Sequence, residues 1–259
     1  MRSVMASIKL MLFCLNCLWV VPLQSLVLFF TKGRAAYHLP MMWHRMACAI
    51  FRIRLTVIGS PNKGQQTLYM SNHISYLDIP VIGSVLKSSF VAKSEVQGWA
   101  VFGFLGSLQQ TVYMKRQRTK IVEEKNALQT RMDGGNSLII FPEGTSTSGL
   151  EVEPFKSSLF SLAMGEGNEN LYIQPITLRV ISIDGRAPQS KEEQDIYAWP
   201  RDMDMELHHH LWRFAKTTGA KMELTFHAPL RASEYKDRKV LAKACHERVS
   251  KGLQIAEAA

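Results

Sequence analysis

Residues 67–78 read TLYMSNHISYLD, and residues 137–145 read SLIIFPEGT. In each stretch an apolar, strand-forming run, 67–71 or 137–141, leads directly into a short polar motif. Such strands alternate with helical patterns along the chain, which predicts an α/β fold with a mixed, largely parallel sheet flanked by helices. Sites in such sheets form where strands end and loops begin, so we expect both motifs at one site.

The chain beyond these two stretches carries the same alternation of patterns. We expect further strands at 89–92, 111–114, 171–180 and 222–227, and helices at 79–86, 119–132, 157–164 and 237–254. Residues 184–204 are polar and irregular, and we expect them to form an exposed excursion. No internal repeat and no low-complexity linker interrupts the pattern.

The N-terminal residues 8–30, IKLMLFCLNCLWVVPLQSLVLFF, are almost all apolar. A run of about 20 such residues can cross a bilayer core as a helix, and this run is long for a cleaved signal peptide. No small-residue cleavage site follows it directly, which favours a retained membrane anchor. Basic residues on both sides give no clear orientation, as is typical of a half-buried helical hairpin.

Residues 37–55 mix apolar side chains with arginines and predict an amphipathic helix at the lipid headgroup plane. The sequence leaves open an alternative in which the apolar stripe of this helix packs on the following domain. We divide the chain into a membrane-anchoring helical region, residues 1–55, and a catalytic domain, residues 56–259.

The composition is that of an ordinary globular protein, with 46% hydrophobic and 20% charged residues, and it excludes wholesale disorder. The net charge of +9 calls for an anionic partner, either nucleic acid or an anionic membrane face. The apolar N-terminus favours the membrane. The aromatic and basic interleaving of single-strand binders is absent from the sequence, so we expect no nucleic-acid partner. The sequence leaves the oligomeric state open.

We expect no metal site. Cys14 and Cys17 lie inside the apolar run without a second pair nearby, which favours buried thiols over metal or redox chemistry. A helix would spread the consecutive histidines 208–210 around its circumference, which favours a solvated helix over a metal site.

His73 and Asp78 are five positions apart, so an unbroken helix would not place them on one face. A loop that carries His73 and enters a helix near Asp78 would let the carboxylate reach one ring nitrogen, leaving the other as a general base. An alternative stays open in which Asp78 only caps a helix and His73 is a loop histidine. No G-x-S-x-G motif occurs, so we expect a substrate hydroxyl as the nucleophile.

The second motif follows a buried strand, which Pro142 ends before a turn at residues 143–145. Gly144 would let backbone N–H groups approach a phosphate or a developing oxyanion. A plain β-turn with a capping threonine is the alternative for this motif alone. The presence of His73 in the same chain favours the functional interpretation.

The pairing of residues 72–78 with residues 141–145 resembles the glycerolipid acyltransferases, the 1-acylglycerol-3-phosphate O-acyltransferase family, which carry N-H-x4-D and F-P-E-G-T motifs in this order. Two weaker blocks, residues 112–116 and 173–176, are also similar to blocks of that family. The resemblance covers residues 67–180 well and the rest loosely, and the combination of motifs is highly specific.

The resemblance implies an enzyme of phospholipid biosynthesis that moves a fatty acyl chain from acyl-CoA or acyl-carrier protein to a lysolipid hydroxyl, with no metal or tightly bound cofactor. His73 would be the base, and Asp78 would orient it. The acceptor would be bound by Asn72, Arg116, Glu143, Gly144 and Thr145, with Arg116 at its anionic head. The implied location is a bacterial inner membrane, with the catalytic face on the cytoplasmic side.

One residue departs from the commonest family pattern, because the position after F-P-E-G-T is usually arginine and is Ser146 here. Serine does not replace the bidentate phosphate contact of arginine. Lysophosphatidate is the default acceptor, but this continuation and residues 197–199 and 202–204 are more similar to the bacterial branch that acylates lyso-ornithine lipid. A lipid hydrolase and a non-catalytic membrane-binding module are the alternatives from other classes.

Overall fold

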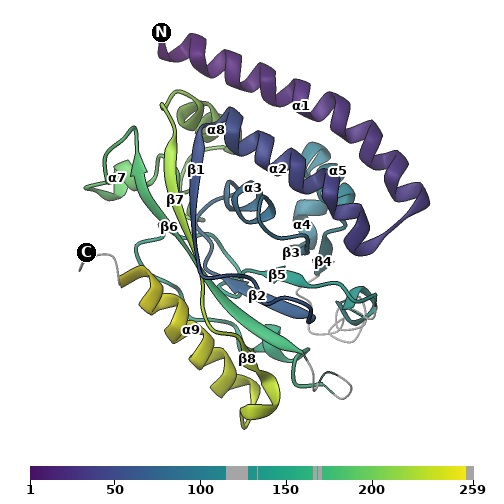
Figure 1. Cartoon of the computed structure of the whole chain (residues 1–259). Coiled ribbons are helices and arrows are strands. Elements are labelled where there is room, and N and C mark those ends of the chain that lie inside the picture. The colour runs from purple at the N-terminus through teal and green to yellow at the C-terminus, as the bar shows by residue number, and fades with distance from the viewer. Residues whose placement is uncertain (115–127, 133, 166–167, 169–170, 255–259) are drawn as a thin grey trace.

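The computed structural model describes residues 1–114, 128–132, 134–165, 168 and 171–254. Eight strands form one sheet in the order β1-β7-β6-β2-β5-β3-β4, and β8 also pairs with β6 (Figure 1). The strands are β1 (Ile53–Ile58), β2 (Thr67–Ser71), β3 (Ser89–Lys93), β4 (Val112–Met114), β5 (Leu138–Ile140), β6 (Tyr172–Ile183), β7 (Ala220–Phe226) and β8 (Leu230–Arg231).

Most of the strand pairs in this sheet are parallel. β2 is parallel to its neighbours β5 and β6, β3 is parallel to β4 and β5, and β1 is parallel to β7. In the described part of the chain, β6 pairs antiparallel with β7 and β8. The predicted mixed, largely parallel sheet is therefore confirmed.

Helices cover both faces of the sheet (Figure 1). α2 (His38–Ile50), α3 (Asp78–Gly83) and α8 (Leu207–Ala215) share a core with Tyr69 of β2, whereas α9 (Arg238–Gln254) shares the opposite core with Leu68 and Met70. Every residue of β2 is buried, as expected for a parallel strand covered on both faces. The other described elements are η1 (Gly33–Tyr37), α4 (Ser94–Gln97), α5 (Ala100–Leu108), η3 (Ser157–Phe160), α7 (Lys191–Gln194) and η4 (Ala232–Glu234).

The N-terminal residues form the expected pair of helices. α1 (Arg2–Phe30) is one helix of 29 residues, connected through η1 to α2, and it packs against α2, α5 and α8 (Figure 1). Among the described helices, α1 alone is long and apolar enough to cross a membrane, judged by length and composition.

The faces of α1 are reversed relative to an ordinary surface helix. The polar side chains of Lys9, Asn16 and Gln24 face the domain, and none is more than 4% exposed. The opposite face carries exposed apolar side chains, with Leu18 72% and Phe29 82% exposed. α1 therefore presents an apolar surface to its surroundings.

Hydrogen bonds to backbone oxygens hold the polar side of α1 on the domain. Lys9 Nζ donates to the carbonyl of Thr217 at 2.8 Å, and Gln24 Nε2 donates to the carbonyl of Leu108 at 3.1 Å. Because a buried donor without a partner is costly, these bonds fix the side of α1 that faces inward.

The helix expected over residues 37–55 is shorter than predicted. It ends at Ile50, and Arg52 then adopts a φ of 56° in the turn that leads into β1 at Ile53. The expected domain boundary at residue 55 thus falls inside a strand of the sheet. The division into an anchoring region and a catalytic domain stays a prediction.

Two further expectations about elements are corrected. The helix expected at 157–164 is a single 3₁₀ turn, η3. Residues 184–204 are not simply an exposed excursion, because Tyr197 and Ala198 are completely buried. Most of the helix expected at 119–132 lies outside the described residues, and its last residues, 128–132, are helical.

Candidate active site

The two motifs meet at one edge of the sheet because the strands that carry them are neighbours. β2 and β5 run parallel, with Leu68 opposite Leu138 and Met70 opposite Ile140. Parallel neighbours end at the same edge, which places residues 72–78 next to the turn after β5.

His73 and Asp78 form a hydrogen-bonded pair, as expected if a loop carries His73 into a helix that begins near Asp78. Asp78 is the first residue of α3, and its Oδ2 lies 2.8 Å from His73 Nδ1. The Asp78 side chain is fully buried, whereas 21% of the His73 side chain is exposed. An ionised carboxylate only accepts hydrogen bonds, so Nδ1 of the neutral imidazole carries the proton and Nε2 has the lone pair of a base.

The Asp78 carboxylate has three further donors. The backbone N–H groups of Ile74 and Ser75 donate to Oδ2 at 2.7 and 2.9 Å, and the Tyr197 hydroxyl donates to Oδ1 at 3.2 Å. These donors fix the position of the carboxylate. These contacts hold the Asp78 carboxylate in one position beside the His73 ring.

Tyr197 is a site residue that sequence reasoning missed. It lies in the segment expected to be exposed, yet it is completely buried, with its ring centroid 5.7 Å from that of Phe214 on α8. The available signal was the local run of apolar and aromatic residues at 196–199, which interrupts an otherwise polar stretch.

The turn after β5 forms a wall beside the histidine. The Phe141 ring stacks on the His73 ring, with centroids 4.1 Å apart and planes inclined by 18°. The Gly144 N–H donates to the Phe141 carbonyl at 3.0 Å and closes the turn with φ at +73°, a conformation that glycine adopts without strain.

The Glu143 side chain points inward and is 2% exposed. Its Oε1 accepts from the His73 N–H at 2.6 Å, and its Oε2 accepts from the Glu153 N–H at 2.8 Å. Burial raises the pKa of the Glu143 carboxyl to about 8, while the two backbone hydrogen bonds act in the opposite direction. Glu143 thus ties the histidine loop to the segment that follows the turn.

The Asn72 side chain also makes hydrogen bonds within the fold. Its Nδ2 donates to the Leu178 carbonyl at 2.9 Å, and its Oδ1 accepts from the Leu178 N–H at 2.8 Å. This two-point contact holds the start of the histidine loop against β6.

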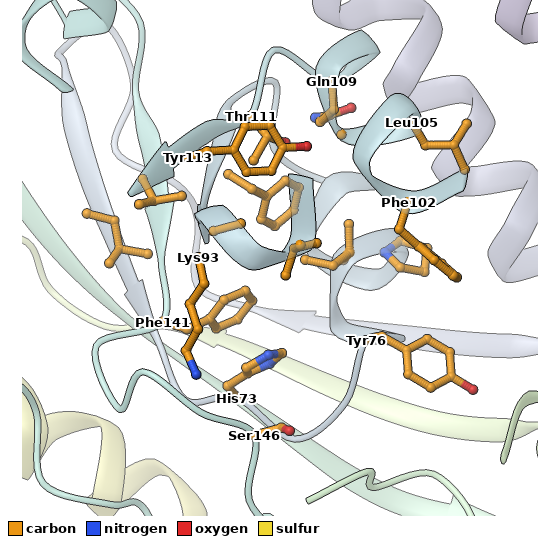
Figure 2. A pocket seen from close by; sticks show the side chains of 18 of the residues that line it. His73, Tyr76, Lys93, Phe102, Leu105, Gln109, Thr111, Tyr113, Phe141 and Ser146 are labelled. Carbon is orange, nitrogen blue, oxygen red and sulfur yellow. The ribbon is translucent and has the colours of Figure 1, made fainter. Parts of the chain in front are cut away.

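A cavity of about 920 Å³ extends from the histidine into the space between the sheet and the helices α1, α2 and α5. Figure 2 shows His73 and Ser146 at one end of it, Gln109 toward the other, and Phe102 and Leu105 along its side. Its walls are mostly apolar, so it suits a long hydrocarbon chain.

The predicted acceptor-binding residues divide into three groups. Gly144 and Thr145 line the cavity, whereas Asn72 and Glu143 are buried beside it. Arg116 lies outside the described residues. A direct contact of any of these residues with the acceptor stays a prediction.

The three consecutive histidines lie at the start of α8 and have different surroundings. His208 and His209 are exposed beside Glu206, with ligand atoms of the three side chains within 4.8 Å of one another. His210 is completely buried, and its Nδ1 lies 3.0 Å from the Tyr76 hydroxyl. His208 and His209 are therefore exposed to solvent as expected, whereas the expectation is wrong for His210, and the expected absence of a metal site stays a prediction.

Comparison with known proteins identifies the family. A model of the acyltransferase family matches residues 53–179. The chain is 33% identical to a lyso-ornithine lipid O-acyltransferase of Brucella abortus, over 92% of this chain and 89% of the relative. It is 30% identical to a 1-acyl-sn-glycerol-3-phosphate acyltransferase of Neisseria gonorrhoeae, over 73% of this chain and 70% of the relative.

Among solved structures, the chain is similar in fold to the 1-acyl-sn-glycerophosphate (LPA) acyltransferase PlsC from Thermotoga maritima. The TM-score is 0.66 at 19% sequence identity, covering 100% of this chain and 99% of that chain. With the histidine-aspartate pair and its apolar cavity already described, these similarities lead to one conclusion: the chain belongs to the acyltransferase family and is an O-acyltransferase of lysolipids.

Proposed function

We propose that this protein is a membrane-associated lyso-ornithine lipid O-acyltransferase that uses His73 as its general base. The observation that carries the proposal is the His73–Asp78 pair, with a separation of 2.8 Å, at one end of a long apolar cavity. A base beside a hydrocarbon-sized cavity is the arrangement that transfer of an acyl chain requires.

The reaction follows from the protonation states of the pair. His73 Nε2 removes the proton of the acceptor hydroxyl, and the oxygen attacks the thioester carbonyl of acyl-CoA or acyl-carrier protein. A new ester bond forms, the carbon–sulfur bond breaks, and the imidazolium returns its proton to the leaving thiolate. Asp78 stabilises the imidazolium between these steps, and no metal or bound cofactor takes part.

The remaining predicted residues take two kinds of role in this proposal. Asn72 and Glu143 position the histidine loop through their contacts with Leu178 and with the His73 N–H. Gly144 and Thr145 line the end of the cavity at which the acceptor enters. The role expected for Arg116, at an anionic head such as the phosphate of lysophosphatidate, stays a prediction, because Arg116 lies outside the described residues.

Membrane association explains how the cavity receives its substrates. α1 contributes Phe13, Val20 and Val21 to the cavity wall and carries exposed apolar side chains on its outer face. A helix with these two faces would lie between the lipid phase and the acyl chain. We place the enzyme at a bacterial inner membrane, with residues 1–55 as the anchoring region. The catalytic face is toward the cytoplasm, where acyl-CoA and acyl-carrier protein are found.

The choice of acceptor rests on the relatives and on Ser146. Relatives named lyso-ornithine lipid O-acyltransferase in Brucella abortus and Rhizobium meliloti match 92% and 98% of this chain. Lysophosphatidate is the second candidate, because a relative named for that reaction matches 73% of the chain. The serine after F-P-E-G-T lacks the guanidinium that a phosphate favours.

A competition assay tests the proposal. Purified full-length enzyme in detergent receives labelled acyl-CoA, or acyl-carrier protein charged with the same chain, together with equal amounts of both lysolipids. We expect diacylated ornithine lipid as the main product. Phosphatidate as the main product would favour the second candidate, and product from neither lysolipid with either donor would contradict the proposed function.

A variant then tests the base. His73→Ala should lower turnover by at least about 100-fold, because a positioned base contributes this much. His208→Ala, on an exposed histidine of α8, serves as the matched control and should leave turnover unchanged. Turnover of folded His73→Ala protein close to that of the wild type would show that another group is the base.

A further inference from the structure

Ser146 connects the turn after β5 to a distant segment of the chain. Its hydroxyl donates to the Trp199 carbonyl at 2.6 Å, and its own carbonyl accepts from the Arg201 N–H at 3.2 Å. These two bonds hold residues 199–201 beside the turn. The serine that replaces the usual arginine of the family is thus used to position another segment, which itself carries an arginine.

The same segment is also bonded to the histidine loop. The Trp199 N–H donates to the Ile74 carbonyl at 2.9 Å, and the Thr147 N–H donates to the His73 carbonyl at 2.9 Å. The backbone of Arg201 is therefore connected to His73 through short hydrogen-bonded steps. The segment that carries Arg201 is thus attached to the histidine loop by its backbone.

The Arg201 side chain lines the cavity and is exposed. Its backbone N–H is used by Ser146, but within the described part of the chain its guanidinium has no hydrogen-bond or ion-pair partner. A guanidinium offers a planar set of donors that matches a carboxylate in two-point fashion. Arg201 is thus available to an anionic ligand at this end of the cavity.

Two lysines make this end of the cavity more cationic. Lys156 lines the cavity beside the turn, where its N–H donates to the Pro142 carbonyl at 2.9 Å. Figure 2 shows the Lys93 amine turned toward the end at which His73 and Ser146 lie. Both lysines already interact within the chain, so Arg201 is the cation that we assign to the ligand.

We propose that Arg201 binds the carboxylate of the acceptor's amino-acid head group, as an anion subsite next to Ser146. The inference rests on the proposed function and names the residue that recognises its acceptor. One guanidinium matches the single charge of a carboxylate, whereas a phosphate monoester carries nearly two charges at neutral pH. The arginine that the F-P-E-G-T motif lacks would then be supplied by a different segment of the fold.

Arg201→Gln tests this subsite in the full-length enzyme in detergent. We expect the KM for lyso-ornithine lipid to rise about tenfold or more, because a charge-assisted hydrogen-bond pair is lost, with the KM for the acyl donor unchanged. Arg54→Gln, on an exposed arginine of the edge strand β1, is the matched control and should change neither constant. An unchanged donor KM also shows that the variant is folded.

Three results would overturn the assignment. An unchanged acceptor KM in Arg201→Gln would remove Arg201 from the subsite, and an equal rise in both KM values would indicate a general structural effect. A larger loss with lysophosphatidate than with lyso-ornithine lipid would contradict a carboxylate ligand. Wild-type enzyme that accepts neither lysolipid would reject the proposed function and this inference together, whereas the first three results leave the proposed function standing.

A gain-of-function variant gives an independent readout. Ser146→Arg combined with Arg201→Gln returns the guanidinium to the turn itself. Each variant has a preference, which is the rate with lysophosphatidate divided by the rate with lyso-ornithine lipid. We expect this ratio to be higher in the double variant than in Arg201→Gln alone. No shift in preference between these two variants would contradict the idea that the two positions serve one head-group subsite.

Discussion

The Asp78 carboxylate connects its own loop to one distant part of the chain. It accepts hydrogen bonds from the histidine ring, from two backbone N–H groups of its own loop, and from Tyr197. Tyr197 is the only one of these donors that comes from outside the motif. It therefore connects the His73–Asp78 pair to the segment between β6 and α8.

Tyr197→Phe should weaken this connection without abolishing the reaction. We expect a loss of about 1 kcal/mol in the free energy of unfolding, the usual net contribution of one hydrogen bond, and a fall of a few-fold in kcat/KM.

Asp78→Asn should lower kcat/KM far more, by about 100-fold or more, because the proposed base loses its orienting group. Thermal unfolding and initial rates measure both effects. Equal activity losses in the two variants would contradict the supporting role of Tyr197.

Glu143 predicts a pH dependence of stability. Burial raises its pKa from 4.5 to about 8, so the folded protein keeps a proton that the unfolded chain releases above pH 4.5. The free energy of unfolding should therefore fall as pH rises from about 4.5 to 8, by at most about 1.4 kcal/mol per pH unit. Melting curves at pH 6 and pH 8 test this, and Glu143→Gln should show a smaller difference. The same difference in both proteins would contradict the assignment.

The sequence was informative about individual residues where their interactions are local. The His73–Asp78 contact could be predicted because five residues and one helix start determine it. The hydrogen bonds that Asn72 and Glu143 make within the fold could not be predicted. Their partners, Leu178 and Glu153, depend on how the strands are ordered in the sheet. Long-range contacts of this kind leave no periodic signal along the chain.

Elements were predicted best where one physical pattern dominates. The apolar runs of β2 and β5 gave the correct strands, because buried parallel strands consist almost wholly of apolar residues. The pattern at 157–164 predicted a helix, yet only one 3₁₀ turn forms there. The strand at 53–58 was missed because its apolar residues continue the helical pattern of α2 without a break in composition.

α1 allows a prediction at the scale of a whole helix. Its outer face carries Leu18 and Phe29, and a charge on this face should oppose membrane binding by on the order of 2 kcal/mol per residue. The double variant Leu18→Glu, Phe29→Glu should no longer float with phospholipid vesicles, whereas its activity in detergent should remain. Leu18→Met, Phe29→Met is the control. Complete flotation of the charged variant would show that this face of α1 does not contact lipid.

At the scale of the whole molecule, the sheet order determines which loops can meet. β2 is central and β5 is its neighbour, although the described elements α3, β3, α4, α5 and β4 separate them in sequence. The alternation of strand and helix patterns indicated an α/β sheet, but neither the strand order nor the antiparallel pairing of β6 with β7 could be read from it. These depend on packing of the whole chain.

The long crossover between β2 and β5 also has an evolutionary consequence. It carries α5 and β4, which form part of the cavity wall, whereas the hydrogen-bonded pair His73–Asp78 lies at its very beginning. In the proposed reaction, substitutions in α5 or β4 would alter the length or shape of the hydrocarbon that the cavity accommodates, while the proton-transfer chemistry would be inherited unchanged. Selection on fatty-acid composition can thus act on one stretch of gene almost independently of selection on catalysis.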